Sequence, residues 1–218
     1  MALTPFAFKL IAPHIKGAVL AFGYPDILMS PAQASEVIGK HLTKSTPFGG
    51  SHKRDILLAD TLEVFEACGA TLVCLDLFNT RGEETIIDLN QPLSVGQFDL
   101  VVDAGTIEHC ANIGQALMNA ANAVQPGGYV FHGPPLTMLN HGFYNISPTL
   151  LMDFYGQNGW RVEHLSGHSA ASPYVPVTVS EHARFTAPHG TAMYFLAKRL
   201  DDRPLKWPVQ WKYLPKER

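Results

Sequence analysis

Short, nearly continuous apolar runs alternate along the chain with longer segments in which apolar residues recur every three or four positions. Such runs are typical of strands buried on both faces, and the periodic segments are typical of helices that cover a sheet. The predicted strands are residues 18–22, 71–76, 84–88, 98–103, 129–132, 161–165 and 191–198. The predicted helices are residues 31–41, 54–68, 113–124 and 148–156.

This alternation predicts an α/β fold, namely a doubly wound, mostly parallel sheet with helices on both faces. Residues 1–200 are predicted to form one domain. Residues 201–218 contain three prolines and two tryptophans and are predicted to form an irregular C-terminal arm that packs through its aromatic side chains.

The junctions between elements carry the expected signals. Ser30 precedes Pro31 and predicts a helix start, and Gly69 predicts the end of the helix over 54–68. A long connection, around residues 40–54, is rich in Ser, Gly and Pro and contains the run Phe48-Gly49-Gly50-Ser51-His52. It has two interpretations, a lid or substrate loop and a surface loop without a role in binding.

Composition narrows the class of protein. The 218 residues are 46% hydrophobic and 16% charged, a composition that excludes a disordered chain. The formal net charge of −3 excludes general electrostatic binding to nucleic acid or to an anionic membrane. The three cysteines are an odd number at no metal-binding spacing, so we expect reduced thiols and a cytoplasmic protein. No apolar run approaches the ~18 residues that span a bilayer, and no signal peptide is expected.

Polar residues follow four of the predicted strands. Gly23 follows the first strand, Asp76 ends the second, Asp88 ends the third, and residues 103–109 begin at the end of the fourth. Ligands of open parallel sheets bind outside these carboxyl ends, where carboxylates suit ribose hydroxyls and an adenine edge. Each acid taken alone has a second interpretation as a helix cap or turn residue.

At this point the sequence resembles the class I S-adenosylmethionine-dependent methyltransferases of the type-11-like group. The resemblance rests on FDLVVDAGTIEHCANIGQALMNAANAVQPGGYVFHGPP (98–135) and HGFYNISPTLLMDFYGQNGWRV (141–162). It implies a seven-stranded sheet with an antiparallel last strand, and S-adenosylmethionine as cofactor. The cofactor-binding residues that it implies are Gly23, Tyr24, Asp26, Asp76, Asp88, Leu89, Asp103, Ala104 and Gly105.

The first loop departs from the family pattern. The family normally has acid-x-Gly-x-Gly-x-Gly there, whereas this chain has Ala21-Phe22-Gly23-Tyr24-Pro25-Asp26. Asp26 is the candidate to replace the missing acid near the methionine ammonium. A methyltransferase-like protein that no longer binds the cofactor is the other interpretation.

Two histidines are candidate bases for methyl transfer. His109 follows Glu108 in the loop after the fourth strand, and its ordinary pKa of about 6.5 suits proton transfer near neutral pH. His141 begins a loop with aromatic and amide side chains suited to an acceptor. The predicted substrate-binding residues are Glu108, Phe143, Tyr144 and Asn145. The alternatives are that Glu108 and His109 cap the next helix, and that Asn145 or Ser147 caps the helix over 148–156.

No metal site is predicted, because no Cys-x-x-Cys or His-Glu-x-x-His pattern is present. His132 and His141, or His164 and His168, could approach each other, but the i,i+4 spacing of the second pair falls in a predicted strand, where such residues lie far apart. Cys110 is interpreted as a buried thiol.

The predicted function is methyl transfer to a hydroxyl or amine of a small-molecule acceptor, such as a sugar or specialised metabolite. The alternative is a catalytically silent binding or scaffold protein. No nucleic-acid or membrane partner is expected, and a homo-oligomer is left open.

Overall fold

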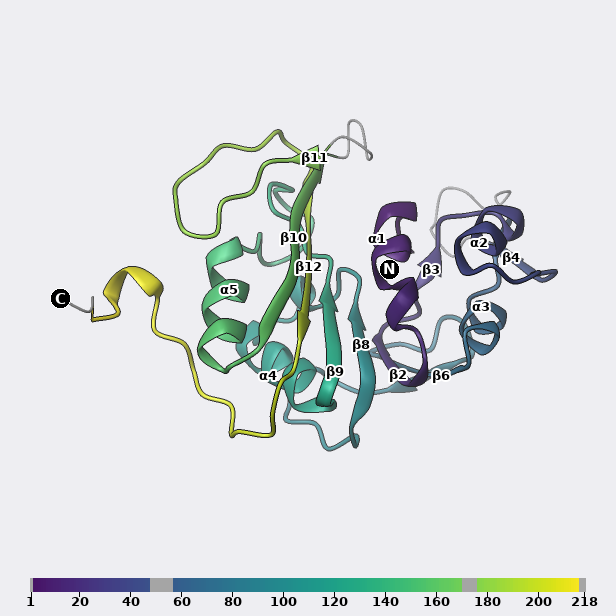
Figure 1. Ribbon diagram of the computed structural model, residues 1–218, viewed down its shortest axis with the longest axis horizontal. Coiled ribbons are helices and arrows are strands. Elements are labelled where there is room, and N and C mark those ends of the chain that lie inside the picture. The colour runs from purple at the N-terminus through teal and green to yellow at the C-terminus, as the bar shows by residue number, and fades with distance from the viewer. Residues whose placement is uncertain (1, 48–56, 170–175, 216–218) are drawn as a thin grey trace.

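An eight-stranded sheet runs through the middle of the molecule, with the strand order β11-β10-β12-β9-β8-β2-β6-β7 (Figure 1). The structure is a computed structural model that describes residues 2–47, 57–169 and 176–215. The strands are β2 (Gly17–Phe22), β6 (Ala70–Asp76), β7 (Glu84–Ile86), β8 (Phe98–Asp103), β9 (Val124–His132), β10 (Arg161–Ser169), β11 (Pro176–Val177) and β12 (Thr191–Lys198).

The strand directions agree with the predicted fold class. Strands β7, β6, β2, β8 and β9 are parallel, and β12 is antiparallel to both of its neighbours, β9 and β10. All seven predicted strands are present, and the two-residue strand β11 adds an eighth at the edge next to β10. Chain order reverses between β2 and β8, so the carboxyl ends of these strands form the switch point at which such sheets bind ligands.

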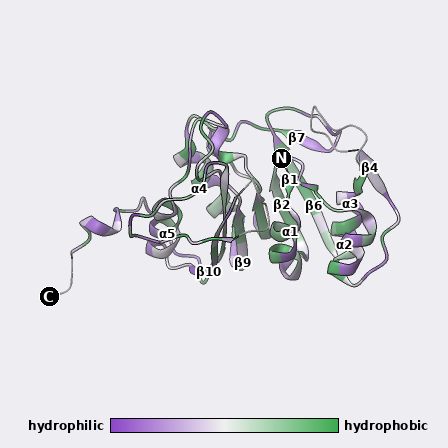
Figure 2. Cartoon of the chain, turned by 90° about the horizontal axis from the view of Figure 1, so that it is seen from above, coloured by the Kyte–Doolittle hydropathy of each residue, from purple (hydrophilic) through white to green (hydrophobic). Residues whose placement is uncertain are grey.

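Helices cover both faces of this sheet (Figure 1). Helices α4 (Ile113–Ala123) and α5 (Pro148–Gln157) pack on one face, and α1 (Pro5–Ile11), α2 (Pro31–Ile38) and α3 (Thr61–Ala67) pack on the other. Strand β2 contributes to both cores, with Leu20 and Phe22 on one side and Val19 and Ala21 on the other. Hydrophobic residues therefore gather along β2 in Figure 2.

A second, four-stranded sheet contradicts one predicted helix. It has the order β1-β3-β5-β4 and consists of β1 (Ala2–Leu3), β3 (Asp26–Ile27), β4 (Ser45–Pro47) and β5 (Leu57–Ala59). The predicted helix over 54–68 is therefore wrong at its start, because residues 57–59 form a strand. Asp60 then caps α3 by accepting a hydrogen bond from the Glu63 amide (2.9 Å). Tertiary pairing here outweighs the helical periodicity of the apolar residues.

The other predicted helices are present with small changes at their ends. Ser30 and Gln33 form a capping box at the start of α2, and the helix ends at Ile38 rather than at residue 41. Three short 3₁₀ helices complete the described structure, η1 (Ala12–His14), η2 (Ile107–His109) and η3 (Trp211–Tyr213). The predicted run over residues 48–52 lies outside the described residues.

Apart from η3, the described part of the C-terminal segment, residues 199–215, contains no helix or strand. It runs along α5, where backbone amides of Lys206 and Val209 donate to the side chains of Asn158 and Gln157, and then projects outward (Figures 1 and 2). The ring of Trp211 stacks on His182, with ring centroids 4.5 Å apart. Of the helices in the described ranges, none combines the length and hydrophobicity needed to cross a bilayer.

Candidate functional site

Two cavities open at the edge of the large sheet where its parallel strands end. Each has a volume of about 300 Å³. Gly105 and His109, in the loop that follows β8, line both cavities. The loop over residues 103–109 therefore forms a wall between two neighbouring binding spaces.

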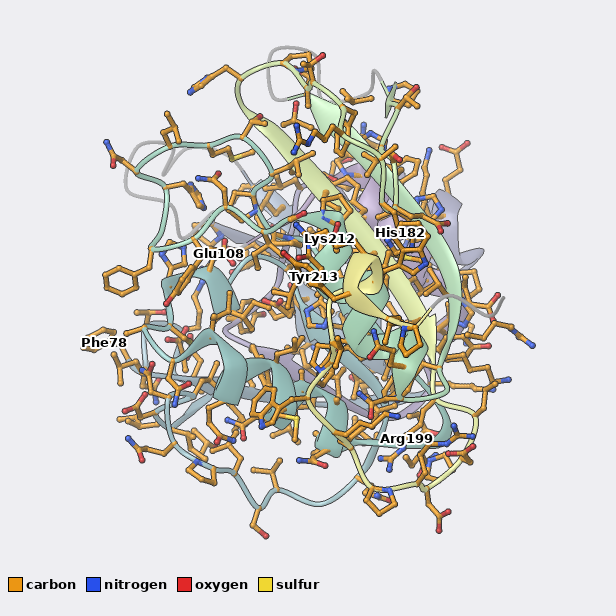
Figure 3. The ribbon with its side chains drawn as sticks, turned by 90° about the vertical axis from the view of Figure 1, so that its left-hand side faces the viewer. Phe78, Glu108, His182, Arg199, Lys212 and Tyr213 are labelled. Carbon is orange, nitrogen blue, oxygen red and sulfur yellow. The ribbon has the colours of Figure 1, made fainter. Side chains whose placement is uncertain are left out.

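The first of these, the Asp76 cavity, has acidic and amide groups on apolar walls. It is lined by Asp76, Leu77, Phe78, Ile87, Asp88, Leu89, Asn90, Gly105, Thr106, His109 and Cys110. The Asp76 carboxylate accepts hydrogen bonds from the amides of Leu77 (2.6 Å) and Phe78 (3.4 Å) and retains acceptor capacity. Phe78 is 66% exposed and projects at the edge of the molecule, on the same side of the view as Glu108 (Figure 3).

Asn90 fixes the neighbouring carboxylate of Asp88. Its backbone amide and side-chain Nδ2 both donate to Asp88 Oδ1, at 2.9 and 2.7 Å. These hydrogen bonds lower the pKa of Asp88, so the side chain is an anion at neutral pH. The Asn90 side chain in turn accepts a hydrogen bond from the Asn112 amide (2.8 Å), which connects this rim to the start of α4.

The first loop turns sharply after β2. Gly23 has φ +77°, a value that glycine adopts at little cost, and its amide donates to the Leu75 carbonyl (2.6 Å). Gly23, Tyr24 and Asp26 do not appear among the described residues that line either cavity. Tyr24 and Asp26 are buried, so the loop folds against protein at these two positions.

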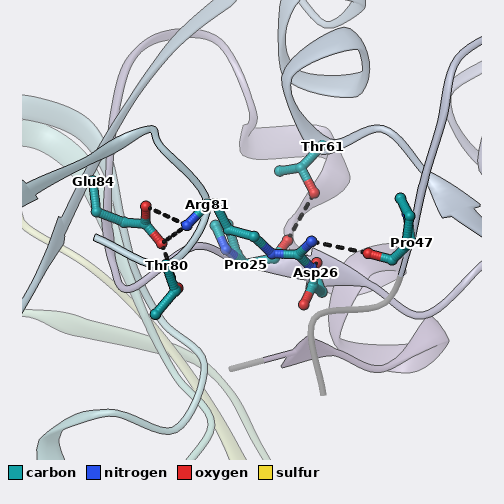
Figure 4. Close-up of polar contacts among 7 residues, drawn as sticks. All are labelled: Pro25, Asp26, Pro47, Thr61, Thr80, Arg81 and Glu84. Atoms are coloured by element: carbon teal, nitrogen blue, oxygen red, sulfur yellow. Dashed lines mark hydrogen bonds and ion pairs between the residues drawn. The ribbon is translucent and has the colours of Figure 1, made fainter. Parts of the chain in front are cut away.

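Arg81 is the partner that the sequence did not predict for Asp26. Its guanidinium forms an ion pair with Asp26 and donates to the Pro47 carbonyl (2.9 Å; Figure 4). It also lies 5.3 Å from the centre of the Tyr24 ring. Glu84 accepts hydrogen bonds from the Arg81 amide and from Thr80. We refer to Arg81 with Asp26, Pro47 and Tyr24 as the Arg81 clasp. The structure thus brings Asp26 to Arg81 and not to the loop over 103–109.

Asp103 lies beneath the wall between the cavities, with both oxygens occupied. Oδ1 accepts hydrogen bonds from the amides of Thr106 (2.8 Å) and Ile107 (3.3 Å), and Oδ2 lies 2.7 Å from His132 Nδ1. His132 Nε2 lies 2.6 Å from the hydroxyl of Tyr155. Asp103, His132 and Tyr155 are fully buried. Asp103 was predicted to line the cofactor site, but here its carboxylate holds the loop that lines it.

The second space, the Glu108 cavity, lies on the other side of the wall. It is lined by Ala2, Thr4, Ala7, Ala104, Gly105, Glu108, His109, Phe131, Gly133, Pro135, Met138, His141, Ala192 and Tyr194. The hydroxyls of Thr4 and Tyr194 share a hydrogen bond (2.8 Å). The N-terminal residues Ala2, Thr4 and Ala7 therefore line this cavity, a role that the sequence did not indicate. The signal available in the sequence was Thr4 before Pro5, which marks the start of α1.

Glu108 is the most unusual residue of this cavity. Its side chain is fully buried, and neither carboxylate oxygen has a hydrogen-bond partner among the described residues. Oε1 lies 3.5 Å from His141 Nε2 and 3.7 Å from His109 Nε2, longer than a hydrogen bond. Burial, together with the charge of Asp103, raises the pKa of Glu108 to about 8. Burial and His141 lower the pKa of His109.

The loop that carries His141 docks directly on Glu108. The amide of Phe143 donates to the Glu108 carbonyl (2.9 Å), and the hydroxyl of Tyr144 donates to the Ala111 carbonyl (2.7 Å). A Cβ atom at Gly142 would lie 2.9 Å from both the Cγ and the carbonyl oxygen of Glu108, so only glycine permits this approach. The loop is built to hold His141 beside Glu108.

The other predicted substrate-binding residues lie in the loop that follows Gly142, where the side chain of Phe143 is exposed. Phe143, Tyr144 and Asn145 were predicted to bind substrate, but they are absent from the described linings of both cavities. Asn145 accepts a hydrogen bond from the Met138 amide (2.7 Å) and closes its own loop. The alternative that Glu108 and His109 cap the next helix is wrong, because Asn112 caps α4. Ser147 precedes α5, but its side chain makes no capping hydrogen bond. Cys110 is buried, and burial raises its pKa to about 11, which agrees with the buried-thiol interpretation.

The sequence predicted no metal site, yet three potential ligands meet in the Glu108 cavity. One ligand atom each from Glu108, His109 and His141 lies within 4.8 Å of the other two. We call these three side chains the Glu108 cluster. The prediction considered His141 only with His132, and could not anticipate that Gly142 brings His141 against Glu108.

Comparisons with known proteins agree with this arrangement. A family described as "Methyltransferase domain" matches residues 71–132, the segment that supplies most of the Asp76 cavity and the wall between the cavities. The crystal structure of TehB from Haemophilus influenzae matches with a TM-score of 0.51 and 10% identity over 89% of this chain. The match covers 60% of the TehB chain, so this chain spans less than two thirds of that protein. No curated protein matches the sequence.

At 10% identity, the likeness to TehB concerns the fold. The family match is independent of it and covers residues 98–132 of the first segment on which the resemblance rests, but not residues 141–162. The resemblance is thus supported at two levels: residues 71–132 match a methyltransferase domain, and the likeness to TehB supports the Rossmann-like fold.

Proposed function

We propose that the protein transfers the methyl group of S-adenosylmethionine to a hydroxyl or amine of a small-molecule acceptor. The observation that carries this proposal is the pair of cavities that share Gly105 and His109. A methyl donor in one and an acceptor in the other would meet where the two cavities adjoin, beside Gly105 and His109. Methyl transfer requires this, because the reacting atoms must be held in line and close together.

The Asp76 cavity has the chemistry that the cofactor needs. Asp76 would accept hydrogen bonds from ribose hydroxyls, Asp88 and Asn90 would bind the polar edge of adenine, and Ile87 and Leu89 supply apolar walls. The bound cofactor supplies a methyl group activated by a sulfonium, and the electrons of the broken C–S bond return to sulfur. Asp26 would bind the ammonium group at the methionine end of the cofactor. The cofactor's ammonium would then compete with the Arg81 guanidinium, which forms an ion pair with Asp26.

The Glu108 cavity would hold the acceptor. Its volume of about 300 Å³ suits a small molecule, and the hydroxyls of Thr4 and Tyr194 can orient it. The acceptor's proton would pass to the Glu108 cluster, where burial keeps the Glu108 carboxyl ready to exchange a proton near neutral pH. We expect a cytoplasmic enzyme, since its three cysteines are free thiols, and no nucleic-acid or membrane partner, since its net charge is −3.

Calorimetric titration with S-adenosylmethionine and S-adenosylhomocysteine tests the proposal. Asp76→Asn should weaken both by about 1–3 kcal/mol, the scale of a lost charged hydrogen bond, while Asp202→Asn in the exposed C-terminal segment should leave affinity unchanged. Unchanged affinity in a folded Asp76→Asn variant would refute the ribose assignment.

Absence of binding by either ligand would refute the transferase proposal. It would favour the catalytically silent binding protein instead, an alternative suggested by the Arg81 clasp, which occupies the acid of the first loop. A binding protein of this kind would retain the fold and both cavities, so thermal unfolding in the absence of ligand would not distinguish the two.

A further inference from the structure

We propose that the Glu108 cluster is a binding site for a first-row divalent transition-metal ion. The ligands would be Oε1 of Glu108, Nε2 of His109 and Nε2 of His141. Neither the family match nor the structural match assigns a metal to this chain.

The separations between ligand atoms fit a metal better than direct contacts. Glu108 Oε1 lies 3.5 Å from His141 Nε2 and 3.7 Å from His109 Nε2. Bonds of about 2.0–2.2 Å at tetrahedral angles place ligand atoms about 3.3–3.6 Å apart, whereas hydrogen bonds require about 3 Å. The histidine ligand atoms lie within 4.8 Å of each other, and both histidine side chains are about half exposed, so the two imidazoles have room to adjust to a shared cation.

The burial of Glu108 points to a missing cation. The side chain is 0% exposed, and both oxygens lack a hydrogen-bond partner within the described ranges. The ionised form of a buried carboxyl without a partner is costly, and a bound metal ion stabilises that form by taking the place of the carboxyl proton. Neither histidine approaches closely enough to satisfy it, because both distances exceed hydrogen-bond length.

The donor set indicates which ions suit the site. Two imidazole nitrogens with one carboxylate are typical ligands of zinc and of non-haem iron, whereas magnesium and calcium prefer oxygen ligands alone. Three protein ligands leave at least one coordination position open. In this chain that position would face the Glu108 cavity, which both histidines line.

The local fold holds the three ligands together. Glu108 and His109 lie in the single turn of η2, and the amide of Phe143 donates to the Glu108 carbonyl and thereby fixes the His141 loop. Gly142 allows backbone and side chain of Glu108 to come within contact distance. Two segments about thirty residues apart in sequence are thus fastened at the point where the ligands meet.

The role of the ion in catalysis rests on the proposed function. With the ion bound, the three side chains act as ligands and no longer take up the acceptor's proton. An acceptor oxygen at the open position would have its pKa lowered, so that its proton leaves to water instead and its lone pair forms the new bond to the methyl carbon. The C–S bond breaks, its electrons return to sulfur, and the ion is neither oxidised nor reduced. The acceptor class would then be a hydroxyl compound, preferably one with a second oxygen that also reaches the metal.

Metal binding is tested directly on the full chain after chelator treatment and dialysis. Titration with Zn²⁺ in a calorimeter should show one site per chain, and Co²⁺ should give a visible absorption band that Zn²⁺ abolishes. Glu108→Gln, His109→Ala and His141→Ala should each weaken Zn²⁺ binding at least about 100-fold, since the loss of even outer-shell partners costs 10–100-fold. His41→Ala, at an exposed histidine outside both cavities, should leave it unchanged.

The outcomes separate this proposal from the proposed function. Failure of the wild-type chain to bind Zn²⁺ or Co²⁺, or binding that survives all three ligand variants, would overturn the metal site. Cofactor titration on the same samples is the independent readout. Binding of S-adenosylmethionine without metal leaves the transferase proposal standing alone, and metal binding without the cofactor supports the site and refutes its role in methyl transfer.

Discussion

Replacing Tyr155 by phenylalanine removes one hydroxyl from a fully buried chain of hydrogen bonds. The Tyr155 hydroxyl lies 2.6 Å from His132 Nε2, and His132 Nδ1 lies 2.7 Å from Asp103 Oδ2. In a consistent assignment of protons, Tyr155 donates to Nε2 and Nδ1 donates to the carboxylate. The phenylalanine ring would preserve the edge contacts with Phe154 and Trp160, so the substitution removes a hydrogen bond and little packing.

The expected loss follows from the imidazole nitrogen left without a partner. A buried polar atom in that state costs about 1–3 kcal/mol, more than the net value of an ordinary hydrogen bond. A loss of about 2 kcal/mol lowers the Tm of a chain of this size by about 4–8 °C. Because the substitution does not change the surface exposed on unfolding, the denaturant midpoint should fall with an unchanged m-value.

Urea unfolding and calorimetry of the Tyr155→Phe variant measure this loss. Tyr213→Phe is the matched control, because its side chain is 70% exposed and its free energy of unfolding should change by less than about 0.5 kcal/mol. In a His132→Ala background the effect of Tyr155→Phe should shrink, since the nitrogen it serves is gone. A Tyr155→Phe variant as stable as the wild type, or an undiminished effect in that background, would refute the network as drawn.

Three further substitutions test other parts of the site by urea unfolding. Gly142→Ala should destabilise the protein by about 1–3 kcal/mol, because its Cβ would meet Glu108 at 2.9 Å. The control is Gly156→Ala in helix α5, where a Cβ meets nothing within 4 Å, and it should stabilise the protein by up to about 1 kcal/mol. Equal effects of the two substitutions would contradict the close approach of Gly142 to Glu108. Arg81→Met leaves the buried Asp26 unpaired and should lower the free energy of unfolding by about 3 kcal/mol. Arg161→Met, in the more exposed pair with Glu163, should lower it by less than about 1 kcal/mol. Similar losses in the two variants would argue against the Arg81 clasp. Burial alone would raise the pKa of Glu84, but hydrogen bonds from Arg81, Thr80 and Glu83 outweigh it and lower the pKa. The stability that ionised Glu84 contributes is therefore present above the ordinary glutamate pKa of about 4.3 and is lost as pH falls through the pKa of Glu84 in the folded protein. Glu84→Gln should accordingly be less stable than the wild type at pH 7, and the difference in stability should narrow by pH 3. A difference that does not change with pH would refute this.

The strands of the large sheet could be predicted because each is a short apolar run that needs burial on both faces. The failed prediction was the helix over 54–68, where Leu58 and Ala59 are apolar enough to continue a helical stripe but instead pair in the small sheet. Pairing with residues 45–47 depends on a long-range contact that periodicity does not encode. The role of the N-terminal residues was missed for the same reason.

The candidate site was predictable only in part. The strand-end rule found Asp76, Asp88, Gly105 and His109, because parallel strands bring their carboxyl ends to one edge whatever the details of packing. It could not find the contact between Thr4 and Tyr194, which are 190 residues apart. The strand-end rule also could not distinguish a carboxylate that faces a ligand from one that accepts hydrogen bonds from the backbone. Asp103 is of the second kind.

That difference bears on how the site would work. The carboxylate of Asp103 holds the amides of Thr106 and Ile107, and the Thr106 hydroxyl donates to the Phe22 carbonyl (2.7 Å). The wall between the cavities is therefore fastened both to the core and to the first strand. In-line transfer requires reacting atoms about 3–3.5 Å apart, and small displacements cost large factors in rate. A wall held by buried hydrogen bonds keeps the distance between the two cavities fixed, so we expect ligands to change the His141 loop and the Phe78 rim rather than residues 103–109.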